Sequence, residues 1–240
     1  MRKRRTRTSR EAVALVAVSL IAALSTVGLA VTGQNDESVE RETTIARNLI
    51  ERLIERYESE SSYRILFTQE SYWALADTSV QSNGVLLLER PSNLSVVYDD
   101  GSSIVSNGDT LWVYMAETNQ YFATDIGADD TVIDPPRVLR QYVPDPNDPY
   151  TGPDQTDGIE SAASAVTSAT LFLVPAEGTG EPARLEVQVD PSRTLVTGMS
   201  AHTRSGDTTS YSISDTRFGV ETDPTDFTFE APPGAERIGG

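Results

Sequence analysis

The feature that most constrains the fold of this chain is a change in hydrophobic period near residue 60. From Tyr63 to Phe218 short segments alternate apolar and polar residues or form brief apolar runs, which is typical of β-strands. Turn residues such as Asp100-Gly101 and Asn107-Gly108 separate them, and connections this short predict an antiparallel meander. The expected strands are residues 63–69, 84–90, 94–99, 102–107, 110–115, 120–126, 168–176, 183–190, 194–204, 208–218 and 226–232.

Two segments have helical periodicity instead. The first begins at Ser38 or Thr43 and ends at Tyr57, with one apolar face opposite a charged one. The second, residues 133–143, has Asp134 as N-cap and Pro135 at the first helical position. The apolar residues of these two faces are Ile45, Leu49, Ile50, Leu53, Ile54 and Tyr57 in the first, and Val138, Leu139 and Tyr142 in the second.

These elements predict one mainly β domain of the α+β class over residues 43–240. We expect a strongly curved antiparallel sheet or half-barrel of about ten or eleven strands, covered by two or three helices. A Pro- and Asp-rich loop at 144–158 has Tyr150 as its one core-forming residue. The pattern leaves open whether the sheet surrounds a filled core or an apolar cavity that binds a ligand.

The N-terminus has the pattern of an export signal. A cationic start precedes an uncharged apolar run from Ala12 to Val31, and Gly28-Leu29-Ala30 offers a small-x-small cleavage site. Residues 1–30 are therefore expected to be a signal peptide, or a retained membrane anchor since the run is long enough to span a bilayer. Residues 31–42 form a polar tether.

Charge and cysteine content exclude several classes of function. Residues 1–30 hold six of the 19 basic and one of the 36 acidic residues, so the rest carries 13 basic and 35 acidic residues, a net charge of −22. Such a surface repels nucleic acid, so no nucleic-acid partner is expected. It indicates either a high-salt environment or the bias of an arginine-favouring genome. The absence of cysteine excludes disulfides, thiol catalysis, cysteine-bound metal and a lipid-modified N-terminal cysteine.

No motif predicts an active site, a metal or a cofactor. The sequence GMSAH at 198–202 resembles a nucleophile elbow, but His202 replaces the second glycine and the segment reads as a strand. The Asp-rich loop lacks the spacing of a calcium-binding loop, and there is no phosphate-binding loop. We therefore expect a binding protein rather than an enzyme.

Four ordered motifs carry a resemblance to a known family. They are FTQ (residues 67–69), GVLLLERP (84–91), VSNGDTLWVYMAETNQ (105–120) and FTFEAPPGAERI (227–238). In this order they resemble the periplasmic outer-membrane lipoprotein carrier family, LolA, over residues 45–238. Residues 128–168 depart most from the family pattern.

The resemblance implies a half-barrel whose apolar concave face takes the acyl chains of lipoproteins. It further implies a monomeric periplasmic carrier that needs no cofactor. Its partners would be acylated lipoproteins as cargo, an inner-membrane ABC lipoprotein-releasing transporter, and an outer-membrane acceptor or the outer membrane itself. The arginine of the R-P motif, Arg90, would hydrogen-bond to the helical lid and hold it closed. The residues expected to line the cavity are Leu49, Leu53, Phe67, Leu86, Leu88, Trp112, Tyr114, Val138 and Leu139.

Two alternatives stay open beside the carrier. One is an envelope sensor of lipids or lipoproteins with a LolA-like domain, although such sensors carry an additional C-terminal domain, which we do not expect here. The other is a carrier tethered to the inner membrane by residues 12–31. A hydrolase would need a catalytic triad that the sequence does not offer.

Overall fold

The computed structural model describes residues 37–126, 135–152, 168–177 and 180–239. The expected export segment 1–30, the first residues of the tether, Asp134 and residues 153–158 of the Pro- and Asp-rich loop lie outside the described residues. The described residues form two α-helices, α1 (Glu37–Glu58) and α2 (Pro135–Leu139), and a 3-10 helix η1 (Pro224–Phe227) near the C-terminus. Within the described ranges, no helix combines the length and apolarity that crossing a membrane requires.

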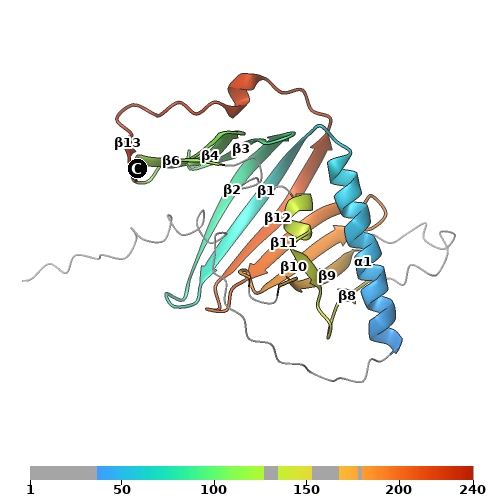
Figure 1. Ribbon diagram of the computed structural model, residues 1–240. Helices are drawn as coiled ribbons and strands as arrows, with labels where there is room; N and C mark the ends of the chain where they lie inside the picture. Colours follow the sequence, from blue (N-terminus) through green and yellow to red (C-terminus); the bar gives the residue numbers. More distant parts are fainter. Residues whose placement is uncertain (1–36, 127–134, 153–167, 178–179, 240) are drawn as a thin grey trace, which may run out of the picture.

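The strands form one large sheet that does not close on itself (Figure 1). Its order is β13-β6-β5-β4-β3-β2-β1-β12-β11-β10-β9-β7, and β8 pairs separately with β9. The strands are β1 (Ser62–Trp73), β2 (Thr78–Glu89), β3 (Asn93–Tyr98), β4 (Ser103–Asn107), β5 (Thr110–Met115), β6 (Gln120–Asp125), β7 (Tyr142–Pro144), β8 (Tyr150–Thr151), β9 (Ala169–Pro175), β10 (Arg184–Asp190), β11 (Leu195–His202), β12 (Thr208–Phe218) and β13 (Glu236–Arg237).

The predicted meander is confirmed. Each of the strands β1 to β5 pairs antiparallel with the next strand in the chain, and so does each of β9 to β11. Gly101 and Gly108 sit in tight turns with φ of +88° and +92°, which a glycine adopts without steric cost. The sheet is joined into one piece by the pairing of β1 with β12, the first and last long strands.

The two faces of the sheet differ in what covers them. We call the face that carries Ile65, Phe67, Leu86 and Leu88 the inner face; α1 and α2 pack on this side (Figure 1). Successive side chains of a strand point to opposite faces, so Val85 and Leu87 lie on the outer face. The last part of the chain leaves β12, crosses the sheet and ends beside β6 (Figure 1).

The expected closing strand at residues 226–232 was wrong. Residues 224–227 form the 3-10 helix η1 instead, and the chain that follows up to residue 235 is not a strand. Asp223 caps η1 by accepting from the backbone N–H of Thr225, while Asp226 accepts from the backbone N–H of Asp223. Only Glu236–Arg237 rejoin the sheet, as the parallel strand β13.

The second helix is shorter than expected, and the first hairpin is longer. α2 ends at Leu139, and Tyr142–Pro144 pair with β9 as β7, so the expected helix at 140–143 was wrong. β1 extends to Trp73 and β2 begins at Thr78, because backbone pairing continues through polar residues that show no apolar alternation.

Candidate functional site

The centre of the inner face is a closely packed apolar layer between α1 and the sheet. Leu49, Leu53 and Tyr57 of α1 have no solvent-exposed surface. They belong to one buried cluster with side chains of β1, β2 and β3 and of β9, β10 and β11. Burial raises the pKa of Tyr57 to about 12, and its hydroxyl accepts a hydrogen bond from the backbone N–H of Val196 at 3.3 Å. Helix α1 therefore occupies the surface on which a ligand of this face would lie.

The structure brings together seven of the nine residues expected to line a cavity and separates the other two. Leu49, Leu53, Phe67, Leu86, Leu88 and Leu139 belong to the buried core, and Val138 packs against it. Trp112 pairs with Val105, which pairs with Ser95, which pairs with Leu87. This row of partners lies on the outer face, as does Tyr114, two residues from Trp112 on the same strand.

Trp112 and Tyr114 take part instead in an aromatic group on the outer face. The ring of Phe229, from the segment after η1, stacks on Trp112 at 6.1 Å between centroids and lies 5.2 Å from the ring of Tyr121. Beside it, a hollow of about 550 Å³ lies between β3–β5 and residues 225–232. The aromatic group thus fixes the C-terminal segment to the sheet.

Part of the inner face is only half covered. We call the six half-buried residues that extend the core there the inner patch: Tyr98, Ile104, Met199, Ala201, Tyr211 and Ile213. Phe67 connects two sides of it, because its ring is 5.7 Å from that of Tyr98 and 5.8 Å from that of Tyr211, both edge-on. These six side chains keep part of their surface exposed while α1 is in place.

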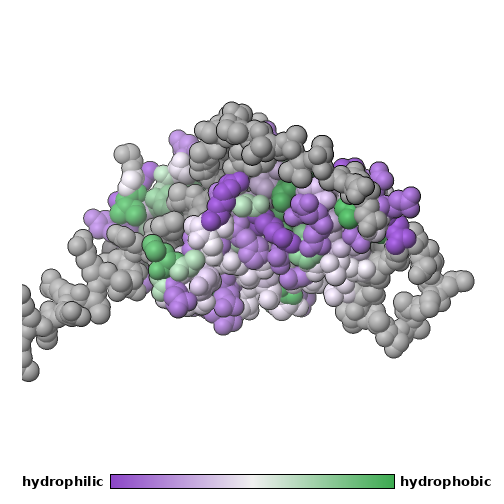
Figure 2. All heavy atoms as spheres, turned by 90° about the horizontal axis from the view of Figure 1, so that it is seen from below, coloured by the Kyte–Doolittle hydropathy of each residue, from purple (hydrophilic) through white to green (hydrophobic). Residues whose placement is uncertain are grey.

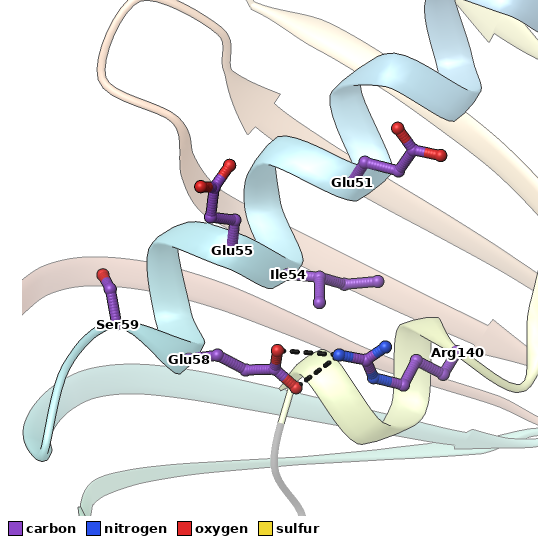
Figure 3. Close-up of a pocket in the computed structure, with 6 residues that line it drawn as sticks. All are labelled: Glu51, Ile54, Glu55, Glu58, Ser59 and Arg140. Atoms are coloured by element: carbon purple, nitrogen blue, oxygen red, sulfur yellow. Dashed lines mark hydrogen bonds and ion pairs between the residues drawn. The ribbon is translucent and has the colours of Figure 1, made fainter.

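One face of the molecule is mostly polar or of intermediate hydropathy where its residues are described (Figure 2). On the face of the molecule in Figure 2, green hydrophobic groups are small and are separated by purple and pale ones. A second hollow, of about 380 Å³, lies where α1 meets α2 (Figure 3). Its floor is Ile54, and Arg140 donates to both carboxylate oxygens of Glu58 at 2.6 and 2.7 Å. This pair is exposed, so it fixes the two helices only weakly.

Arg90 bonds to the end of α1. Its Nε donates to the carbonyl oxygen of Glu60 at 3.2 Å, and one terminal nitrogen donates to the carbonyl oxygen of Tyr57 at 3.1 Å. The last carbonyls of a helix have no partner within the helix and carry the negative end of its dipole. A guanidinium with several donors satisfies them, so Arg90 connects the end of β2 to the C-terminus of α1.

Close approach explains the glycine that precedes the apolar run of β2. A Cβ on Gly84 would lie 2.6 Å from the ring of Phe67 and 3.0 Å from the carbonyl oxygen of Val97. A side chain here would therefore displace Phe67, the residue that connects the two sides of the inner patch.

The segment that resembles a nucleophile elbow is part of strand β11, as predicted. The Ser200 hydroxyl lies 2.9 Å from that of Ser210, while His202 lies 3.2 Å from the Thr208 hydroxyl and 3.4 Å from a Glu186 carboxylate oxygen. Within the described part of the chain, Ser200 and His202 share no hydrogen bond.

The chain matches the model of a known protein family. A protein-family model described as "Outer membrane lipoprotein carrier protein LolA" matches residues 58–230, well over half of the chain. No curated protein matches the sequence.

Several solved structures are similar at low sequence identity. An uncharacterized conserved protein from Thermus thermophilus is 11% identical with a TM-score of 0.45, covering 81% of this chain and 98% of its own. A LolA superfamily protein from Nitrosomonas europaea is 12% identical with a TM-score of 0.37, covering 77% and 97%. LprF from Mycobacterium bovis is 10% identical with a TM-score of 0.39, covering 75% and 95%.

Proposed function

The chain belongs to the LolA family of outer membrane lipoprotein carrier proteins, and we propose that it binds the acyl chains of lipoproteins on the inner face of its sheet and carries them between membranes. The observation that carries this proposal is the apolar inner face, which among the described residues is covered mainly by the amphipathic helix α1, with α2 beside it, rather than by a second sheet. A helix keeps its backbone hydrogen bonds within itself, so α1 can move off the sheet as a unit without losing them. The inner patch offers the first contact for the chains.

The free energies of burial favour the replacement of α1 by acyl chains on the inner face. Returning five large buried side chains of α1 to water costs about 8–15 kcal/mol. Each CH₂ of an acyl chain removed from water contributes about 0.8 kcal/mol, so two long chains contribute roughly 20 kcal/mol. Bound chains can therefore offset the displacement of α1, and a lipoprotein without a carrier would stay in its membrane.

Arg90 is the residue that we propose controls this exchange. Its bonds to the carbonyl oxygens of Tyr57 and Glu60 hold the C-terminus of α1 against the sheet. Movement of α1 away from the sheet breaks these bonds. Arg90 therefore sets the balance between the closed state, in which α1 covers the inner face, and an open state that binds chains.

The sequence contains no nucleotide-binding motif, so loading would take its energy from a partner. We propose an inner-membrane ABC transporter that releases lipoproteins as this partner, and the outer membrane or an acceptor in it as the destination. The carrier acts in the periplasm as a monomer, with residues 1–30 as its export signal. A retained N-terminal segment would instead tether the same binding domain to the inner membrane.

The test is the binding of a fluorescent triacylated lipopeptide to the purified protein, with the deacylated peptide as control. Saturable binding that requires the acyl chains is the expected result. If both peptides bind equally, or neither binds, the LolA fold of this chain serves another purpose.

A further inference from the structure

The apolar inner face contains a small cluster of polar side chains, Gln69, Ser71 and Tyr98, that are bonded to one another. Gln69 and Ser71 of β1 are 6% and 4% exposed. The hydroxyl of Tyr98 donates to Oε1 of Gln69 at 3.0 Å, and Nε2 of Gln69 donates to the hydroxyl of Ser71 at 3.0 Å. Both ends of the amide are thus engaged, which satisfies the polar atoms at this buried position. Gln69 is the last residue of the FTQ motif, whose role the proposed function leaves unexplained.

Tyr211 lies beside Gln69 and differs from Tyr98 in the hydrogen bonding of its hydroxyl. It pairs with Gln69 across β1 and β12, and its ring meets that of Phe67 opposite Tyr98. Burial raises the pKa of Tyr98 to about 12. Burial also raises the pKa of Tyr211, and the nearby Tyr98 raises it further. Both phenols are therefore neutral donors. Among the described residues, the Tyr98 hydroxyl has an acceptor in Gln69, whereas the Tyr211 hydroxyl has none.

The surroundings of Tyr211 restrict what its hydroxyl can bond. Its apolar neighbours on the inner face are Met199, Phe67 and Ile213, which suit a hydrocarbon chain. Its polar neighbour is Gln69, whose amide is already bonded to Tyr98 and Ser71. The inner patch contains no cation, so a phosphate or carboxylate would lose its hydration there without a compensating charge. A neutral carbonyl oxygen accepts a hydrogen bond at a much smaller desolvation cost.

We propose that the Tyr211 hydroxyl donates to the ester carbonyl of an acyl chain lying on the inner patch, and so selects ester-linked lipids. This inference rests on the proposed function, because it names the part of the lipid that the site recognises. The bond from Tyr98 to Gln69 keeps the Tyr98 hydroxyl from donating to the lipid. This hydrogen bond therefore holds the ester end of the acyl chain, which is the end closest to the glycerol, beside Tyr211.

The experiment compares two lipopeptides that differ only at the linkage. One carries two ester-linked palmitoyl chains and the other two ether-linked hexadecyl chains, which lack the carbonyl. Their binding to the unmodified protein, Tyr211→Phe and Tyr72→Phe is measured by titration, with thermal unfolding as the check on folding. Tyr72 is an exposed tyrosine of the β1–β2 hairpin and serves as the matched control.

We expect the unmodified protein and Tyr72→Phe to bind the ester lipopeptide about three- to tenfold more tightly than the ether lipopeptide, the effect of one net hydrogen bond. Tyr211→Phe should bind both with the weaker affinity. Equal binding of the two by the unmodified protein, or a preference that survives in Tyr211→Phe, would overturn the inference and leave the proposed function intact. If neither lipopeptide binds, the proposed function fails and this inference fails with it.

Discussion

At the scale of single residues, Arg90 shows how far the sequence alone leads. The resemblance to the LolA family implied an arginine bonded to a helical lid, and Arg90 does bond to carbonyl oxygens in and just after the last turn of α1. Which helix and which carbonyls depend on how the chain turns between α1 and β1, and no local pattern specifies that. Gln69 and Tyr211 were not predicted as site residues, because polar side chains in a strand pattern suggest the outer face.

Replacing Arg90 by leucine tests its position directly. Arg90→Leu removes two charge-assisted hydrogen bonds, so we expect the free energy of unfolding to fall by roughly 1.5–3 kcal/mol. The rate of lipopeptide binding should rise, because the closed state loses the hydrogen bonds that hold α1 against the sheet. Chemical denaturation and stopped-flow binding measure the two effects. Arg217→Leu, at an exposed arginine of β12, is the control and should change neither. An Arg90→Leu variant with faster unfolding but unchanged lipid binding would separate stability from gating.

At the scale of elements, hydrophobic periodicity predicted the helix and the strands that have a clear apolar pattern. It did not predict the elements that lack one. Helix α1 and strands β3–β6 and β9–β12 lie close to where the pattern placed them. The apolar alternation of Phe227 and Phe229 suggested a strand, but Pro224 and the Asp223 cap favour the 3-10 helix. β5 is apolar on both faces, so its pattern could not show that Trp112 faces outward.

Phe229 is one of the attachments of the C-terminal segment, beside the buried Phe227 and the pairing of β13 with β6. Phe229→Ala removes the ring between Trp112 and Tyr121, which we expect to cost about 2 kcal/mol of local stability. The segment after η1 should then be cleaved faster in limited proteolysis, while the circular dichroism of the sheet is retained. In a Trp73→Phe background, the fluorescence of Trp112 should shift to the red. Val143→Ala, at an exposed residue of β7, is the control. An unchanged cleavage rate would show that other contacts hold the segment.

At the scale of the whole molecule, buried tyrosines predict a characteristic response to alkali. Burial raises the pKa of Tyr57, Tyr98 and Tyr142 from 10.0 to about 12 and raises that of Tyr211 as well. The folded state thus holds these protons more tightly than the unfolded state. Their contribution to stability is complete below pH 10 and is lost as the pH rises through about 12.

Urea denaturation at a series of pH values measures this loss. The stability should fall steeply between pH 10 and pH 12, and less steeply in Tyr142→Phe, which removes one of the titrating groups. Tyr72→Phe should follow the unmodified protein. Stability that declines well below pH 10 would point to other groups.

The arrangement of α1 over the inner face is the central claim, and its most direct test is a distance measurement. Because the chain contains no cysteine, spin labels can be attached at introduced cysteines alone. One label at Glu55, on the exposed side of α1, and one at Ser212, exposed on β12, report the separation of helix and sheet. A second pair at Gln81 and Ser212 reports the sheet itself. We predict that triacylated lipopeptide lengthens the Glu55–Ser212 distance and leaves the Gln81–Ser212 distance unchanged. Saturable lipopeptide binding with both distances unchanged would contradict the claim that acyl chains replace α1 on the inner face.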